Sequence, residues 1–192
     1  MFKLFMTIGT CAVLVMFTIF TMLTMLMPPA LAVAGLAQGS LQFEPPEGWI
    51  EEAAAAPMRV AQFILPKAAG DAEDAVLVVF YFGGEGGGIE ANLERWISQM
   101  EQPDGRPSEE VAISTTFEAN GLAVTVLDVP GTYVAPVRPG SNMRYNKPLF
   151  HLKAAVVETP SGPYFFRLTG PERTVARWDA SVISLLRNVR FQ

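Results

Sequence analysis

Cysteine and histidine are scarce in this sequence, and both scarcities exclude classes of chemistry. Among its 192 residues there is one cysteine, Cys11, inside a long apolar run near the amino terminus. Beyond that run, no intramolecular disulfide and no thiolate metal site can form. The single histidine, His151, rules out a His-rich zinc site and is the only residue that could complete a Ser-His-Asp triad. We interpret His151 as a structural residue, and we expect no metal, no cofactor and no catalytic residue.

Positive charge is also in short supply. Lys3 is the one basic residue among the first 37, which contain no acid. Residues 38–192 therefore carry 13 Lys and Arg against 19 Asp and Glu, a net charge of −6. Proteins that bind nucleic acids concentrate basic residues on one surface. We therefore expect no nucleic-acid partner.

The amino-terminal run predicts export. Residues 4–27 carry no charge and are followed by Pro28 and Pro29. The small-x-small pattern at residues 30–34 is typical of a signal-peptide cleavage site, whereas the length of the run is sufficient for an uncleaved membrane anchor. Both alternatives stay open, and both leave Lys3 on the cytoplasmic side.

This pattern divides the chain into two parts. Residues 1–37 are interpreted as an apolar leader helix, either a signal peptide or a membrane signal-anchor. Residues 38–192 are interpreted as a single exported domain of about the usual size for one core. We expect this domain to be periplasmic or otherwise extracytoplasmic, and anchored to the inner membrane by residues 4–27 if the leader is not cleaved.

The clearest local pattern in the domain lies at residues 75–100. Residues 75–82 form an almost continuous apolar run, which is typical of a strand covered on both faces. Five glycines at positions 83–88 predict a sharp turn. A helix is expected over residues 89–100, because its apolar residues fall on one face. That stripe consists of Ile89, Leu93, Trp96, Ile97 and Met100.

The glycines also match a variant of the dinucleotide-binding fingerprint, Gly86-x-Gly88-x-x-Ala91. We reject nucleotide binding because Glu85 and Glu90 would face the pyrophosphate. The later segments also follow one another as hairpins and do not form βαβ units.

The rest of the domain alternates strands and turns and ends in a second helix. Asn120-Gly121 between two apolar runs predicts a hairpin of residues 111–117 and 122–129. The final helix is expected to begin at residues 169–171. Further strands are expected at 58–65, 151–158 and 164–168, and the buried stripe of the last helix consists of Val175, Trp178, Val182, Leu185 and Leu186. This order predicts an α+β domain with a mostly antiparallel sheet and two amphipathic helices packed on it.

One irregular segment, residues 135–148, is the candidate contact site. It contains three prolines and three cations, although the domain is acidic. Long loops in compact domains are often functional. The candidate ligand or partner contacts are Arg138, Arg144, Tyr145 and Lys147. The alternative is a solvated loop whose cations pair with nearby carboxylates.

Short motifs in the domain resemble known proteins. The opening Phe43-x-Pro45-Pro46-x-Gly48-Trp49, the late hairpins and the closing segment 185–191 resemble the Mog1/PsbP-like fold. Residues 80–96 and 168–171 resemble uncharacterised exported bacterial proteins. The resemblance implies a non-enzymatic binding or assembly role and assigns no site residues.

Three functions follow as hypotheses. The first is a binding or assembly module of the cell envelope, with an envelope protein as partner. The second is a small-ligand carrier with a pocket between helix and sheet, lined by Trp96 and tyrosines. The third is a hydrolase, but Glu109 and Glu110 would point to opposite faces of a strand, and Ser161 lies outside a nucleophile-elbow motif. We therefore expect no enzymatic activity.

Overall fold

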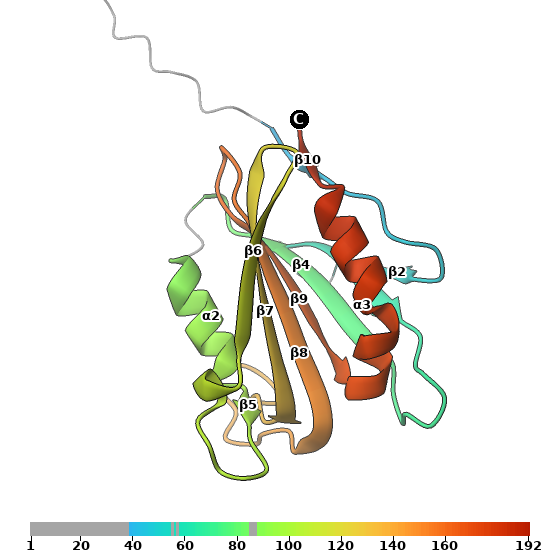
Figure 1. The fold of residues 1–192 in the computed structure, drawn as a ribbon, viewed down its shortest axis with the longest axis vertical. Coiled ribbons are helices and arrows are strands. Elements are labelled where there is room, and N and C mark those ends of the chain that lie inside the picture. The colour runs from blue at the N-terminus through green and yellow to red at the C-terminus, as the bar shows by residue number, and fades with distance from the viewer. Residues whose placement is uncertain (1–38, 55, 57, 85–87) are drawn as a thin grey trace, which may run out of the picture. The chain divides into compact units, whose positions relative to one another are not determined.

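An antiparallel sheet of eight strands is the centre of the computed structural model, which describes residues 39–54, 56, 58–84 and 88–192 (Figure 1). Its spatial order is β2-β3-β4-β9-β8-β7-β5, and β6 also pairs with β7. The strands are β2 (Ile50–Glu52), β3 (Arg59–Leu65), β4 (Ala75–Tyr81), β5 (Met100–Glu101), β6 (Ile113–Ala119), β7 (Leu122–Tyr133), β8 (Lys147–Val157) and β9 (Tyr164–Pro171). A separate pair is formed by β1 (Leu41–Gln42) and β10 (Arg190–Phe191).

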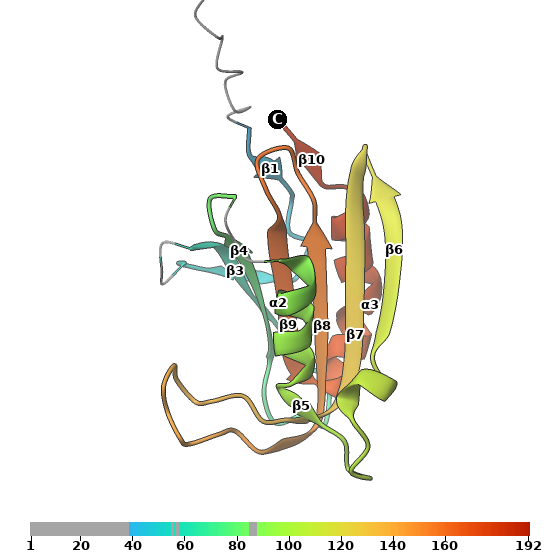
Figure 2. The ribbon, with the colours of Figure 1, turned by 90° about the vertical axis from the view of Figure 1, so that its left-hand side faces the viewer.

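A helix covers each face of the sheet (Figures 1 and 2). These helices are α2 (Ile89–Ile97) and α3 (Glu172–Arg187), and a short 3-10 helix, η1 (Ser108–Glu110), precedes β6. Successive side chains of a strand point to opposite faces. In β9, Phe166 therefore joins the apolar cluster under α3, and Phe165 joins the cluster under α2. The α+β class, the antiparallel sheet and the two packed helices are confirmed.

The leader expected over residues 1–37 lies outside the described residues, and so does Gly86, the first glycine of the fingerprint. Within the part of the chain that the structure describes, no helix has both the length and the apolar character needed to span a bilayer.

The predicted hairpin is confirmed. Asn120 and Gly121 have φ values of 51° and 81°, the left-handed conformations of a type I′ turn. The second strand, β7, continues through Tyr133, and its register with β8 shifts between Gly131 and Tyr133. Pro130 and Gly131, which pair with His151 and Phe150, directly precede this irregularity.

The predicted start of the last helix is wrong. Residues 169–171 belong to β9, where Gly170 pairs with His151 of β8. A side chain at Gly170 would collide with Ala75, so the close approach of two strands requires glycine there. The helix begins at Glu172. Asp71, from the loop before β4, accepts hydrogen bonds from the backbone N–H and the hydroxyl of Thr174, and so caps α3 from a distant part of the chain.

Two other boundaries differ from expectation because of pairing with β7. The helix expected to reach Met100 ends at Ile97, and Met100 instead pairs with Tyr133 as part of β5. Lys147, expected in a loop, also pairs with Tyr133 and begins β8. Both segments join the sheet by pairing with Tyr133, at the end of β7.

Candidate functional site

Helix α2 leaves part of its sheet face uncovered. The nine-residue helix packs over residues of β7, β8 and β9 such as Val129, Leu152 and Phe165. On β3 and β4 the side chains of the same face, Ile64 and Val76, stay partly exposed. The central part of the sheet therefore borders an open surface beside α2.

Arg167 of β9 lies on this open surface. Its neighbours across the strands are Val78 and Ala154, which are smaller and apolar. Its Nη2 donates hydrogen bonds to Gln99 Oε1 at 2.8 Å and to the Tyr133 hydroxyl at 2.6 Å. The guanidinium carbon lies 5.7 Å from the centre of the Tyr133 ring. Both hydrogen-bond acceptors are uncharged.

The guanidinium of Arg167 is incompletely satisfied. Its Nε is buried and has no hydrogen-bond partner. Among the described residues, no aspartate or glutamate forms an ion pair with it. A buried donor without an acceptor costs about 1–3 kcal/mol, and more when the group is charged. The guanidinium of Arg167 therefore has hydrogen-bonding capacity that the described residues do not use.

Two hollows of about 180 Å³ each open on either side of Arg167. The first lies beneath α2, where Trp96, Arg95 and Gln99 face the sheet. The second lies toward the 134–146 segment and is lined by Tyr133, Tyr145, Lys147, Phe150, Val76, Val78, Thr169, Glu73 and Asp74. Neither hollow is the hypothesised pocket lined by both Trp96 and tyrosines, because the first has no tyrosine and the second has no residue of α2.

Two of the four predicted contact residues line the second hollow. The Tyr145 ring stacks on Tyr133 with 5.6 Å between centroids. Lys147 Nζ lies 5.1 Å from the ring centres of both Tyr145 and Phe150. Lys147 Nζ also forms an ion pair with Glu73 at 2.6 Å. This pair agrees with the alternative prediction, in which the cations of the loop pair with nearby carboxylates.

We call residues 134–146 the basic hairpin. The other two predicted contacts, Arg138 and Arg144, lie in it but do not line the second hollow. Arg144 Nε donates to the carbonyl of Val134 at 2.6 Å, so this cation holds the hairpin closed. Arg138 is exposed near the tip. The backbone N–H of Val137 donates to the carbonyl of Met143 at 2.9 Å, which closes the tip.

Apolar side chains accompany these cations. Met143 is 62% exposed and Leu149, just after the hairpin, is 75% exposed. Leu149 also has a φ of +55°, a left-handed conformation that is uncommon for a residue other than glycine. Val137, in the same hairpin, is 39% exposed.

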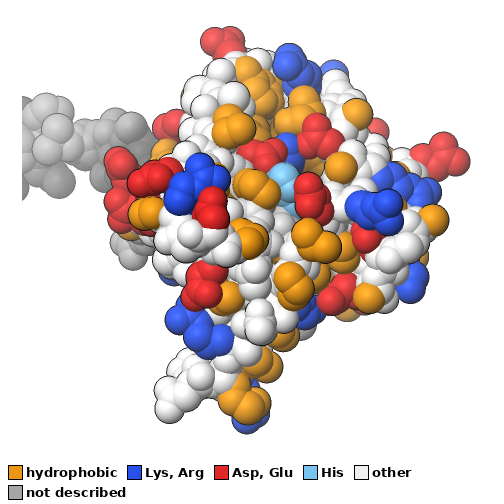
Figure 3. Space-filling model, turned by 60° about the horizontal axis from the view of Figure 1, so that its bottom comes forward, with side chains coloured by type: hydrophobic (Ala, Val, Ile, Leu, Met, Phe, Trp, Pro, Cys, Tyr) orange, Lys and Arg blue, Asp and Glu red, His pale blue; other side chains and the backbone are white. Residues whose placement is uncertain are grey.

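The opposite sheet face carries a closed charge network. Lys153 Nζ lies 2.5 Å from Asp128 Oδ2 and 2.5 Å from Asp179 Oδ1, and His151 Nε2 contacts Asp128 Oδ1. Figure 3 shows the histidine in pale blue, with charged side chains nearby. This arrangement links α3 to β7 and β8 and agrees with a structural role for His151.

The network shifts two pKa values. Burial alone would raise the pKa of Asp128, but hydrogen bonds and charge from His151 and Lys153 outweigh it and leave the pKa below its usual value. Burial alone would lower the pKa of Lys153, but Asp128 and Asp179 outweigh it and leave the pKa above its usual value. Both groups are therefore ionised across neutral pH. Within the described residues, no three His, Cys, Asp or Glu side chains are grouped to hold a metal ion.

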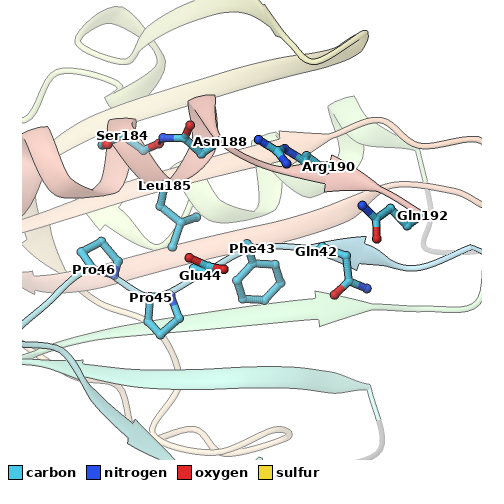
Figure 4. A pocket seen from close by; sticks show the side chains of 10 residues that line it. All are labelled: Gln42, Phe43, Glu44, Pro45, Pro46, Ser184, Leu185, Asn188, Arg190 and Gln192. Atoms are coloured by element: carbon cyan, nitrogen blue, oxygen red, sulfur yellow. Dashed lines mark hydrogen bonds between the residues drawn. The ribbon is translucent and has the colours of Figure 1, made fainter.

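A larger hollow, of about 590 Å³, lies elsewhere (Figure 4). It is an open groove between residues 42–46 and the end of α3 with β10, and Asn188, Arg190 and Gln192 line it. None of the described buried polar atoms that lack a partner belongs to it. Its size alone does not indicate a ligand, so we place the candidate site at Arg167.

Sequence reasoning missed Arg167. The available signal was one cation inside the otherwise apolar strand segment 164–168. A charge in a strand buried on both faces requires a partner or a function. Which of the two applies depends on neighbours from β4, β7 and β8, which lie far away in the sequence.

Comparisons with known proteins concern the fold. No protein-family model and no curated protein matches the chain. One similar solved structure is cyanobacterial PsbP (CyanoP) from Synechocystis sp. PCC 6803, with a TM-score of 0.46 and 12% identity over 86% of this chain and 100% of that chain. A second is LpqN, involved in cell envelope biogenesis of Mycobacterium tuberculosis, with a TM-score of 0.48 and 10% identity over 80% of this chain and 84% of that chain. A third is the Pseudomonas aeruginosa protein of unknown function PA94, with a TM-score of 0.40 and 16% identity over 66% of this chain and 78% of that chain. All three likenesses concern the fold alone.

Proposed function

We propose that this chain is a non-enzymatic binding module of the cell envelope, and that it holds a carboxylate of a partner protein at Arg167. The observation that carries the proposal is the guanidinium itself, which donates to the neutral side chains of Gln99 and Tyr133 and forms no ion pair with a carboxylate among the described residues. Arginine binds carboxylates through paired N–H groups with fixed geometry.

The surroundings of Arg167 support a protein partner. The basic hairpin adds Arg138 and Arg144 to an otherwise acidic domain, and Met143 and Leu149 add exposed apolar area. Contiguous exposed apolar side chains with polar neighbours are typical of interaction surfaces. The partner surface we propose is therefore acidic, with an apolar part that covers the hairpin tip.

The location in the envelope rests on the leader. The uncharged run at residues 4–27 predicts export, with the domain on the far side of the membrane. The partner is accordingly sought among proteins of the envelope.

The test is site-specific photocrosslinking in cells. A photoreactive amino acid at Met143 should capture a defined envelope protein, whereas the same amino acid at Ala176, exposed on α3, should not. Arg167→Gln should abolish the Met143 adduct, and the matched change Arg173→Gln, on α3, should leave it intact.

Thermal unfolding of each variant separates lost binding from lost folding. A Met143 adduct that persists in a folded Arg167→Gln variant would contradict the proposal. The same holds if Met143 and Ala176 give identical adducts.

A small-ligand carrier remains the second candidate, because a hollow lies directly beneath Trp96. Its volume of about 180 Å³ is below the roughly 300–1,000 Å³ of common ligand pockets. Titration with benzoate, a small aromatic anion, should quench tryptophan fluorescence in the native chain and not in Trp96→Phe. Equal quenching in both proteins would exclude this candidate.

A further inference from the structure

Strand β6 (Ile113–Ala119) is a sheet edge that lacks protection. Within the part of the chain that the structure describes, it pairs with β7 along one side and with no strand along the other. Its sequence, Ile-Ser-Thr-Thr-Phe-Glu-Ala, contains no proline, no glycine and no cation. Its register with β7 runs without a bulge from one end to the other. Native proteins commonly protect such edges with charge, proline, bulges or short length.

The opposite edge of the sheet shows such protection. Strand β2 is only three residues long and carries Glu51 and Glu52. Short length and charge both disfavour pairing with another chain. The contrast within one sheet indicates that the open edge of β6 has a use.

The hairpin turn determines which backbone groups of β6 are free. In a two-residue hairpin, the residues that flank the turn, here Ala119 and Leu122, exchange hydrogen bonds. Bonding to β7 then alternates along β6. Ser114, Thr116 and Glu118 direct their N–H and C=O groups away from β7, toward the open side.

We propose that β6 pairs antiparallel with β6 of a second copy of this chain, across a two-fold axis at Thr115. The two sheets then continue into one another through the outward N–H and C=O groups. In this register Ser114 lies opposite Thr116 of the second copy, and Thr115 lies opposite its own counterpart. The interface is isologous, as in most homodimers.

The side chains of β6 are complementary to themselves in this register. Ile113 is 64% exposed, and it would lie opposite the partly buried Phe117 of the second copy. Apolar cross-strand pairs of this kind stabilise sheets. The one charged residue of β6, Glu118, would lie opposite Ala112 of the second copy, so no like charges meet.

This inference is independent of the binding function. The strand order β2-β3-β4-β9-β8-β7 places β6 two strands beyond β8, away from β3 and β4 (Figure 2). Pairing through β6 therefore leaves Arg167 and the basic hairpin accessible.

The test uses cysteine crosslinking of the full chain in cells. Directly opposed residues without mutual backbone bonds have Cα atoms about 4.5 Å apart, within disulfide range. In a Cys11→Ser background, Thr115→Cys should therefore form a disulfide-linked dimer on oxidation. Ala176→Cys, an exposed position on α3, is the matched control and should stay monomeric.

A second variant removes the pairing without removing a backbone hydrogen bond to β7, although it loses the contact between the Thr116 and Thr125 hydroxyls. Thr116→Pro deletes an outward N–H, which is tolerated on an edge strand. It should reduce the Thr115→Cys dimer to the level of the Ala176→Cys control, while circular dichroism shows a folded domain. The native chain should sediment as a dimer at micromolar concentration. A monomer at all concentrations, or Thr115→Cys crosslinking no better than Ala176→Cys, would overturn the inference.

Discussion

The two faces of the sheet differ in the hydrogen-bond and ion-pair partners of their cations. On the α3 face, Lys153 is only 9% exposed and lies between two carboxylates, Asp128 and Asp179. On the α2 face, Arg167 has two neutral acceptors, and its buried Nε has none. Paired buried charges can hold elements together, whereas a buried donor without an acceptor needs an explanation. The explanation we propose is a partner carboxylate.

Helix length accounts for much of this difference. Helix α3 has 16 residues and can place Asp179 over Lys153, but α2 has nine and leaves part of its face open. Polar residues of the α2 face therefore line open hollows of about 180 Å³. The experiments below change one face or the other and are ordered by the expected size of the effect.

Removing the main anchor of α2 should have the largest effect. Trp96 is 4% exposed and meets the edge of Phe165, with 5.9 Å between ring centroids. Trp96→Ala should lower the free energy of unfolding by about 3–5 kcal/mol, because it removes a large side chain and leaves a cavity. Urea unfolding measures this, with the exposed Glu94→Ala as control. A loss below about 1 kcal/mol would mean that α2 contributes little to the face it covers.

Breaking the charge network should have the next largest effect. Asp128→Asn leaves Lys153 with one carboxylate and removes the charged partner of His151. We expect a loss of about 2–3 kcal/mol, below the cost for fully buried pairs because Asp128 is 28% exposed. Asp179→Asn, at a side chain that is 46% exposed, should cost less. Equal losses from the two changes in urea unfolding would contradict the central position of Asp128.

The same network predicts how stability depends on pH. The pKa of Asp128 is lowered, so its contribution is complete above the ordinary carboxyl pKa of about 3.9 and is lost as the pH falls through the lower folded-state value. The pKa of Lys153 is raised, so its contribution is complete below about pH 10.4 and is lost as the pH rises through the folded-state value.

Between about pH 5 and 9, then, this pair contributes a constant stability. Thermal unfolding of the native chain and of Asp128→Asn across pH should converge in strong acid. Curves that stay parallel down to about pH 2 would contradict the prediction.

Replacing the unsatisfied cation should have the smallest effect on stability. Arg167→Met removes a partly buried charge that lacks an anionic partner, and buried ions can often be replaced by apolar residues without loss. We expect a change within about 1 kcal/mol in urea unfolding, together with the loss of the Met143 crosslink. A destabilisation as large as that of Asp128→Asn would mean that Arg167 is a structural residue, and the two faces would then be equivalent.

Local features of the chain were predictable because neighbouring residues produce them. The Asn120-Gly121 turn requires left-handed backbone conformations that these residues adopt readily. The apolar run at residues 75–82 yields β4, and the helical spacing around Trp96 yields α2.

Tyr145 and Lys147 were candidate contacts from sequence, since proline and positive charge mark their segment in an acidic domain, and a contact role for them stays a prediction. They line the second hollow, although Lys147 lies in β8 and pairs with Glu73, 74 residues away. Proline and positive charge therefore identified the segment, whereas the tertiary arrangement of the sheet determines which of its side chains line the second hollow.

The sequence by itself determined where strands and helices form, because hydrophobic period and turn residues act over a few positions. Tertiary structure alone decided the start of α3, where Asp71 caps Thr174 across 103 residues. It also decided the different states of Lys153 and Arg167, two cations in adjacent strands. The charge of each side chain follows from its own residue, but its partners come from other strands and helices. These partners determine whether the cation is paired with carboxylates, as Lys153 is, or has no carboxylate partner among the described residues, as is the case for Arg167.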